Sequence, residues 1–177
     1  MSAKNLISQL ISIIIESTNS SKKPVSENKQ EDEKPGLKSV DGFYEWKKGY
    51  NFPLSKYFST KEFSCKCNFP DCKTQRISKT LITQLDQVRE EIKQPLIITS
   101  AYRCMKHQAF LRAAGVNTVV AKQSTHEQGL AADIVPKDMK DTRGAFLKIV
   151  EKHFDSIGLS SQFLHVDLRV GKRRWEY

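Results

Sequence analysis

Two short stretches of this sequence contain histidine and aspartate residues among otherwise apolar ones. These are residue types that commonly bind metal ions. The first, residues 124–135, reads Ser-Thr-His-Glu-Gln-Gly-Leu-Ala-Ala-Asp-Ile-Val and contains His126 and Asp133. Asp133 falls within an apolar run that is typical of a buried strand, where an unpaired charge is costly. Gly129 lies between the two and permits a turn that a larger residue would resist. The buried carboxylate therefore predicts a charged partner or a metal ion.

The second stretch, residues 163–168, reads Phe-Leu-His-Val-Asp-Leu. Alternate side chains of a strand share one face, so His165 and Asp167 are expected to project together. Two imidazoles and a carboxylate, from His126, Asp133 and His165, form a three-ligand set for Zn²⁺ that leaves a fourth position for water. Zinc acidifies such a water molecule and polarises a carbonyl, which suits amide hydrolysis. The residues alone also allow a simpler interpretation, in which His165 and Asp167 form a hydrogen-bonded pair and Asp133 caps a turn.

The four cysteines form a second group of reactive side chains. Cys65, Cys67 and Cys72 lie within eight residues, and Cys104 is distant in the sequence. This spacing leaves three alternatives open: a structural metal site that lacks part of the usual pattern, a disulfide that includes Cys104, or reduced and partly buried thiols.

Three ordered motifs give the chain a resemblance to the peptidase M15 family. They are Ser-Ala-Tyr-Arg-Cys at 100–104, the stretch 124–134 around His126 and Asp133, and Phe-Leu-His-Val-Asp at 163–167. The segment 58–67 and the pair Arg-Trp at 174–175 resemble one carboxypeptidase branch, so the likeness spans about residues 55–177. The family contains zinc D-Ala-D-Ala carboxypeptidases and peptidoglycan endopeptidases, many of them encoded by phages. The implied fold is a compact α+β domain, like that of hedgehog and the D-Ala-D-Ala peptidases, in which helices flank a small antiparallel sheet that carries the zinc site.

The resemblance also assigns roles to individual residues. It implies that Arg103 stabilises an oxyanion or holds a substrate carboxylate, which suits its fixed charge and planar fork. The residues implied as zinc ligands are His126, Asp133 and His165, and those implied as substrate contacts are Tyr102 and Ser124.

The chain departs from the family pattern at the position of the general base. Several branches carry Glu or Asp three residues before the last histidine ligand, where this chain has Gln162. Strand alternation makes Asp167 the best candidate for the base, because it faces the same cavity as His165. The alternatives are that Asp167 orients His165 or is itself a ligand. Glu127, beside a ligand, is a weaker candidate.

The sequence outside the motifs predicts three segments. Residues 1–19 are expected to form an amphipathic helix, because Ile7, Leu10, Ile11 and Ile14 follow helical spacing. A secretory signal is the alternative. Residues 20–40 have the polar composition of a disordered linker, and 41–177 are expected to form the peptidase domain. Because one short helix does not fold alone, we expect it to dock on another copy of the chain, on a partner protein such as a virion component, or on a membrane surface.

Periodicity predicts the elements within the domain. A helix capped by Ser78 carries an apolar stripe from Leu81 to Ile92, and residues 96–99 form a buried strand. The remaining expected elements are a short turn at 61–63 capped by Ser59 or Thr60, a helix over 105–114, strands over 130–135 and 163–170, and a helix opened by Asp141 or Thr142.

Composition narrows the class of partner. The net charge is +9, of which all but one unit belongs to residues 41–177; this suits either an anionic partner or ordinary solubility, and the charge alone does not separate the two. The basic residues are scattered without interleaved aromatics, so no nucleic acid is expected, and no apolar run has the length of a transmembrane segment. We therefore expect a zinc peptidase of bacterial peptidoglycan that acts at the cell wall, either on a virion or after release at host lysis. The alternatives are a wall-binding module that has lost catalysis and a protein that uses zinc only for stability.

Overall fold

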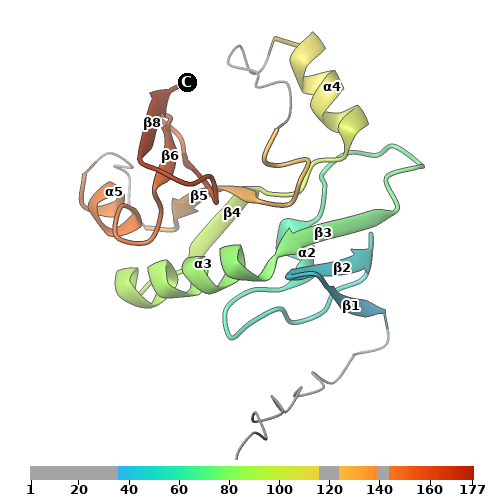
Figure 1. Ribbon diagram of the computed structural model, residues 1–177, viewed down its shortest axis with the longest axis horizontal. Coiled ribbons are helices and arrows are strands. Elements are labelled where there is room, and N and C mark those ends of the chain that lie inside the picture. Colours follow the sequence, from blue (N-terminus) through green and yellow to red (C-terminus); the bar gives the residue numbers. More distant parts are fainter. Residues whose placement is uncertain (1–35, 116–123, 139–143) are drawn as a thin grey trace, which may run out of the picture. The chain divides into compact units, whose positions relative to one another are not determined.

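The computed structural model describes residues 36–115, 124–138 and 144–177. These residues form an α+β domain built on two sheets, with helices packed beside them (Figure 1). The predicted helix at 1–19 and residues 20–35 of the predicted linker lie outside this part of the chain, as do Asp141 and Thr142. Among the described residues, none of the helices has the length and apolar character needed to cross a lipid bilayer.

The smaller sheet has three antiparallel strands in the order β1-β2-β3. Strand β1 begins before Asp41, so the folded domain includes the last residues of the segment predicted to be a linker. Its single buried residue, Leu37, pairs with buried Trp46 and holds this otherwise exposed strand against the domain. The strands are β1 (Leu37–Val40), β2 (Phe43–Lys47) and β3 (Thr74–Ser78).

The larger sheet has five strands in the order β4-β5-β7-β6-β8. All neighbouring pairs are antiparallel except β6 and β8, so the predicted antiparallel sheet carries one parallel strand at its edge. The strands are β4 (Leu96–Ser100), β5 (Ala131–Pro136), β6 (Ser156–Leu159), β7 (Leu164–Asp167) and β8 (Arg173–Glu176).

In the described part of the chain, four helices accompany the sheets. Helix α2 follows a capping box in which the backbone N–H of Ser59 donates to Glu62, and α3 follows Ser78 as predicted. Helix α3 is followed by its C-cap residue Lys93, which adopts φ of 55°, shortly before Pro95. The helices are α2 (Thr60–Phe63), α3 (Lys79–Ile92), α4 (Met105–Ala113) and α5 (Ala145–Val150).

The core is continuous and joins buried residues of the larger sheet, of α3 and α5, and of the smaller sheet. Helices α3 and α5 pack against each other (Figure 1). Strand alternation sends Ile134 of β5 and Val166 of β7 into this core and leaves the opposite face for polar groups. Strand β4 was predicted to be buried, but Ile97 is 43% exposed because β4 lies at the edge of the sheet. The buried side chains that α3 and α5 contribute are Leu81, Ile82, Leu85, Val88, Phe146 and Val150.

Candidate metal centre

The register of the larger sheet builds the centre from a row of residues on adjacent strands. Ser100 of β4 is opposite Asp133 of β5, and Asp133 is opposite His165 of β7. The row continues through Gly158 of β6 to Trp175 of β8. Directly opposed residues on antiparallel strands have Cβ atoms about 5 Å apart, so this register alone brings the Asp133 carboxylate to the His165 ring.

His126 reaches the same place from a turn that precedes β5. The turn is closed by the N–H of Gly129, which donates to the His126 carbonyl at 3.2 Å. Gly129 has φ of +72°, and a Cβ atom at this position would lie 2.8 Å from the backbone oxygen of Arg76. Only glycine fits both conditions, as the sequence predicted for a turn at this residue. The turn therefore fixes His126 against the sheet.

The three predicted ligands converge on one point. His126 Nε2 lies 3.0 Å from His165 Nδ1, and Asp133 Oδ1 lies 2.9 Å from His165 Nδ1 and 3.3 Å from His126 Nε2. Each of the three residues is only 3% exposed. Zinc bonds of about 2.0–2.1 Å in a tetrahedron separate neighbouring ligand atoms by roughly 3.3 Å. The triangle of donor atoms therefore fits a zinc ion in chemistry and in size.

Hydrogen bonds outside the triangle decide which ring nitrogen faces it. His126 Nδ1 donates to the Ala101 carbonyl at 2.6 Å, and His165 Nε2 donates to Asp167 Oδ2 at 3.1 Å. These bonds leave His126 Nε2 and His165 Nδ1 with lone pairs directed at the same point as Asp133 Oδ1. Such outer partners fix the ring tautomer and raise ligand basicity.

The protonation of the group suits a cation site. Burial disfavours an ionised Asp133, but the adjacent His126 and His165 overcome it and hold its pKa well below the usual range. Burial lowers the pKa of His126, which favours its neutral form. Burial also acts to lower the pKa of His165, but the carboxylates of Asp133 and Asp167 raise it overall. The two carboxylates that raise the pKa of His165 also supply the negative charge that would favour a metal cation at this point.

Arg103 braces the carboxylate from the side opposite the histidines. Its Nη2 lies 2.5 Å from Asp133 Oδ2, the oxygen that does not face the triangle. Nε donates to Ser100 at 2.8 Å, Nη1 donates to Gln108 at 3.4 Å, and the residue is only 8% exposed. Ser100 closes the β4 end of the strand row and Gln108 lies on α4, so two elements hold the guanidinium in place.

Asp167 lies beyond His165 rather than beside the triangle. Its Oδ2 accepts from His165 Nε2, the ring nitrogen that faces away from Asp133, and both of its oxygens accept from Arg169. The side chain is fully buried. Burial opposes ionisation of Asp167, but the bonds from His165 and Arg169 outweigh it and lower its pKa.

Two aromatic side chains of the C-terminal segment cover His165. The ring centroids of Trp175 and Tyr177 lie 5.3 and 6.2 Å from that of His165. Gly158 permits this approach, because a Cβ atom there would lie 2.6 Å from the Trp175 ring. The Arg169 guanidinium stacks over Trp175 at 4.9 Å and links this aromatic cover to Asp167.

The other residues singled out by the sequence do not belong to the donor triangle. Tyr102 packs against the cysteines, and Ser124 opens the turn to His126. Glu127 accepts from the Ser124 backbone N–H at 3.0 Å and lies 3.8 Å from Arg112. Gln162 is exposed in the turn between β6 and β7.

The α+β fold with a buried His-Asp-His donor set is suited to a metal-dependent hydrolase. A family model described as Peptidase M15 matches residues 56–167. This is more than half of the 177-residue chain, and the chain belongs to the peptidase M15 family. Peptidases of this family are in general zinc-dependent hydrolases. Comparisons with curated proteins and with solved structures gave no match.

The sequence named Asp167 as a residue that could orient His165, but it did not reveal several other residues that support the ligands from outside. Arg169 lies two positions after Asp167, and strand alternation alone would place the two side chains on the same face. Gly158 and Tyr177 act through contacts across β6 and β8, strands that were not predicted. Ala101 contributes only a backbone carbonyl, for which no side-chain pattern exists.

Proposed function

We propose that this zinc peptidase hydrolyses an amide bond in the stem peptides or cross-links of bacterial peptidoglycan. The observation that carries the proposal is the triangle of His126 Nε2, Asp133 Oδ1 and His165 Nδ1, with sides of 2.9–3.3 Å. Support for the substrate class comes from the motif resemblance, because carboxypeptidases and endopeptidases of peptidoglycan share these motifs. The positive charge of the domain favours an anionic wall polymer.

His126, Asp133 and His165 would hold the zinc ion, which when bound supplies a Lewis acid and an acidified water. The protein contributes the placement of these three donors. The His126 ring is fixed by Ala101, the His165 ring by Asp167, and the carboxylate by Arg103. Because each ligand side chain is already held by its own hydrogen-bond partner, no ligand would have to change its orientation to bind the ion.

Arg103 has a second task in this proposal. Its bonds to Ser100, Gln108 and Asp133 use three of the five guanidinium N–H donors. The two remaining donors make no hydrogen bond to the described residues, and we assign them to a substrate oxygen beside the ligand carboxylate. A fixed positive charge there stabilises either the oxyanion of the reacting amide or the terminal carboxylate of a stem peptide.

For Asp167 we propose an orienting role rather than that of the general base. The carboxylate contacts the far nitrogen of His165, so the imidazole ring stands between it and the metal position. It is also fully buried and already accepts hydrogen bonds from Arg169. A general base must lie within hydrogen-bond reach of the proton that it removes. Asp167 therefore holds the His165 tautomer, which was the alternative that the sequence left open.

The proposed place of action is the bacterial cell wall, reached on a virion or after host lysis. What supports it is the resemblance to peptidoglycan peptidases, many of which are phage-encoded. The polymer itself is the proposed partner of the folded domain.

The experiment that tests the proposal is mass spectrometry of fragments released from defined peptidoglycan by the full chain supplied with zinc. We expect release of D-alanine, or conversion of cross-linked fragments to monomers, and loss of either product after chelation. His126→Ala should lower the rate by at least about 100-fold, since it removes a ligand. His153→Ala is the matched control, because His153 pairs with Glu91 away from the centre. Adsorption to the wall without any product would reject the proposal in favour of a binding module.

A further inference from the structure

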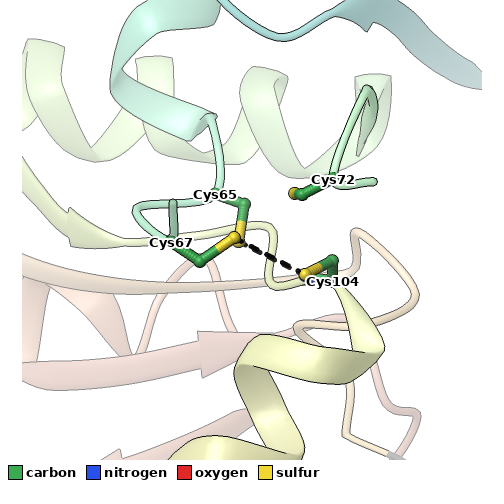
Figure 2. Close-up of side chains that lie close together, drawn as sticks. All are labelled: Cys65, Cys67, Cys72 and Cys104. Carbon is green, nitrogen blue, oxygen red and sulfur yellow. Dashed lines mark hydrogen bonds between the residues drawn. The ribbon is translucent and has the colours of Figure 1, made fainter. Parts of the chain in front are cut away.

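The four cysteines of the chain meet at one point away from the histidine centre. Cys65 and Cys67 follow α2, Cys72 precedes β3, and Cys104 is the N-cap residue of α4. Their four sulfur atoms all lie within 4.8 Å of one another (Figure 2). The first three are buried and Cys104 is half-buried. The cluster thus brings together cysteines that are up to 39 residues apart in the sequence.

The spacing of the sulfurs fits a shared cation. Cys65 Sγ lies 3.5 Å from Cys67 Sγ, and Cys67 Sγ lies 3.7 Å from Cys104 Sγ. Four thiolates around one zinc ion, with Zn–S bonds of about 2.3 Å, have neighbouring sulfurs roughly 3.8 Å apart. All four cysteines are free in the structure, so the disulfide considered from the sequence is not formed. Pairwise bonding would also not explain why all four sulfurs share one centre.

Each sulfur has its own hydrogen-bond donor. The backbone N–H of Cys104 donates to Cys65 at 3.4 Å, and that of His107 donates to Cys104 at 3.4 Å. The two remaining bonds run from Gln75 Nε2 to Cys72 at 3.5 Å and from Lys48 Nζ to Cys67 at 3.7 Å. One donor per sulfur is the outer shell that a cluster of anionic thiolates requires.

Gln75 shows that this environment is built for the cysteines. Its side chain is completely buried, and its amide oxygen accepts from the backbone N–H of Cys65 at 2.7 Å. The amide nitrogen of the same side chain donates to the carbonyl and the sulfur of Cys72. The buried Gln75 amide thus connects the segment of Cys65 to that of Cys72. These hydrogen bonds hold the two segments close together before any ion binds.

The segment that carries the cysteines has little else to fold around. Residues 64–73 contain no helix or strand, and the local core consists of the cysteines with Phe69 and Tyr102 packed against them. A small core without regular structure is the setting in which a bound metal supplies folding free energy.

From these contacts we infer that Cys65, Cys67, Cys72 and Cys104 form a closed, four-thiolate structural zinc site. Sulfur ligands favour zinc, and four protein ligands leave no position for substrate or water. His107 Nδ1 lies 3.2 Å from Cys65 Sγ and belongs to the outer shell. The inference does not rest on the proposed function, because none of these ligands belongs to the histidine centre.

The site gives the histidine centre a rigid support. Cys104 directly follows Arg103, whose backbone N–H donates to the His126 carbonyl at 3.2 Å and whose guanidinium holds Asp133. A metal at Cys104 would therefore pin the segment between β4 and α4 that places Arg103. The sequence pattern lacked this fourth ligand because Cys104 lies far from the other three.

Metal analysis and cobalt substitution of the full chain test the inference. The protein purified under reducing conditions should contain about two zinc equivalents, one of which survives in His126→Ala/His165→Ala. Replacement by Co²⁺ should give intense sulfur-to-cobalt charge-transfer absorption in the near ultraviolet. That absorption should persist in the double histidine variant and be lost in Cys67→Ser/Cys72→Ser. His107→Ala should leave it unchanged, because the histidine is not a ligand.

A second measurement uses the wild-type protein, so the test does not depend on whether the cysteine variants fold. Titration with a mercurial thiol reagent should release one zinc equivalent as the four thiols react. The inference is overturned by a single zinc that only the histidine variants remove, by iron in place of zinc, or by a mass lower by two hydrogens for each disulfide. Failure of peptidoglycan hydrolysis would leave the cobalt–sulfur absorption unaffected, so the two proposals fail separately.

Discussion

Arg103 and Asp133 form a buried ion pair in which the two carboxylate oxygens have different partners. Oδ2 lies 2.5 Å from Arg103 Nη2, while Oδ1 faces the nitrogens of His126 and His165. The arginine therefore holds the carboxylate in the orientation in which its other oxygen completes the donor triangle. Arg103, which was expected to act on the substrate, should therefore also affect how tightly the centre binds its metal ion.

Replacing Arg103 by methionine should weaken zinc binding at the histidine centre. The variant removes the partner of Asp133 Oδ2 and leaves the carboxylate free to rotate, so we expect affinity to fall by about 10–100-fold. Competition with a chromophoric chelator measures this change. Arg173→Met is the matched control, because Arg173 is exposed on β8. Equal affinity in the two variants would contradict the bracing role.

Asp167→Asn separates an orienting residue from a general base. If Asp167 holds the His165 tautomer, the variant should bind zinc about 10–100-fold more weakly and regain activity when zinc is in excess. A lost base instead leaves zinc affinity intact and activity low at any zinc concentration. The measurement is the rate of product release across a zinc titration. Persistent inactivity of the saturated variant would restore Asp167 as the base.

Much of the histidine centre was predictable because short sequence patterns indicate which strands carry its side chains and which way these side chains point. The apolar run around Asp133 and the alternation at His165 and Asp167 both reflect strand geometry, which fixes the direction of side chains from spacing alone. Gly129 also followed from its position in a turn. The pairing of Asp133 with His165 across β5 and β7 depends on register, and that register became visible only in the fold.

The elements that were missed depend on contacts between distant residues. Strand β1 has one buried residue, Leu37, and no alternation that separates it from a polar linker. Strand β8 pairs in parallel with β6 and has no fully buried residue, so its sequence alone does not mark it as a strand. The convergence of Cys104 on the other cysteines likewise requires the β4–α4 connection to be in place.

Trp175 should report the occupancy of the histidine centre. The chain has two tryptophans, and Trp46→Phe leaves only Trp175, whose ring centroid lies 5.3 Å from that of His165. Zinc binding changes the charge beside this ring, so the emission of Trp175 should change during titration of the metal-free protein. Adding His126→Ala should abolish the response in the same range of zinc. A response that survives this change would place the metal elsewhere.

Asp86→Asn should stabilise the fold at neutral pH. Partial burial raises the pKa of Asp86, although Ser55 Oγ donates to it at 2.8 Å, and the asparagine oxygen can keep that bond. A raised pKa means that the charged form is disfavoured in the folded state, so stability declines as pH rises through that pKa. The gain should be up to about 1 kcal/mol, because water screens this partly exposed group. Urea unfolding should show the difference from wild type at pH 7 shrinking as pH falls, and a difference that stays constant across this range would contradict the assignment to the Asp86 carboxylate.

Gly129→Ala should destabilise the protein through two separable effects. The first is backbone strain, since alanine at φ of +72° costs about 1–2 kcal/mol. The second is the contact of the new Cβ atom with the backbone oxygen of Arg76 at 2.8 Å, and relief of such overpacking typically costs a further 1–3 kcal/mol or so. Gly171→Ala is the matched control, because Gly171 has φ of +87° and a Cβ atom there would meet nothing within 4 Å.

The two glycine variants together isolate the contact with Arg76. Urea unfolding of the zinc-loaded chains should show a loss for Gly129→Ala that exceeds the loss for Gly171→Ala by the overpacking cost. Since the Gly129 N–H bonds to the His126 carbonyl, relief by movement of the turn would also displace a ligand and weaken zinc binding. Gly171→Ala should leave zinc affinity unchanged. Equal losses of stability in the two variants, with equal zinc affinity, would mean that the turn moves freely and does not fix His126.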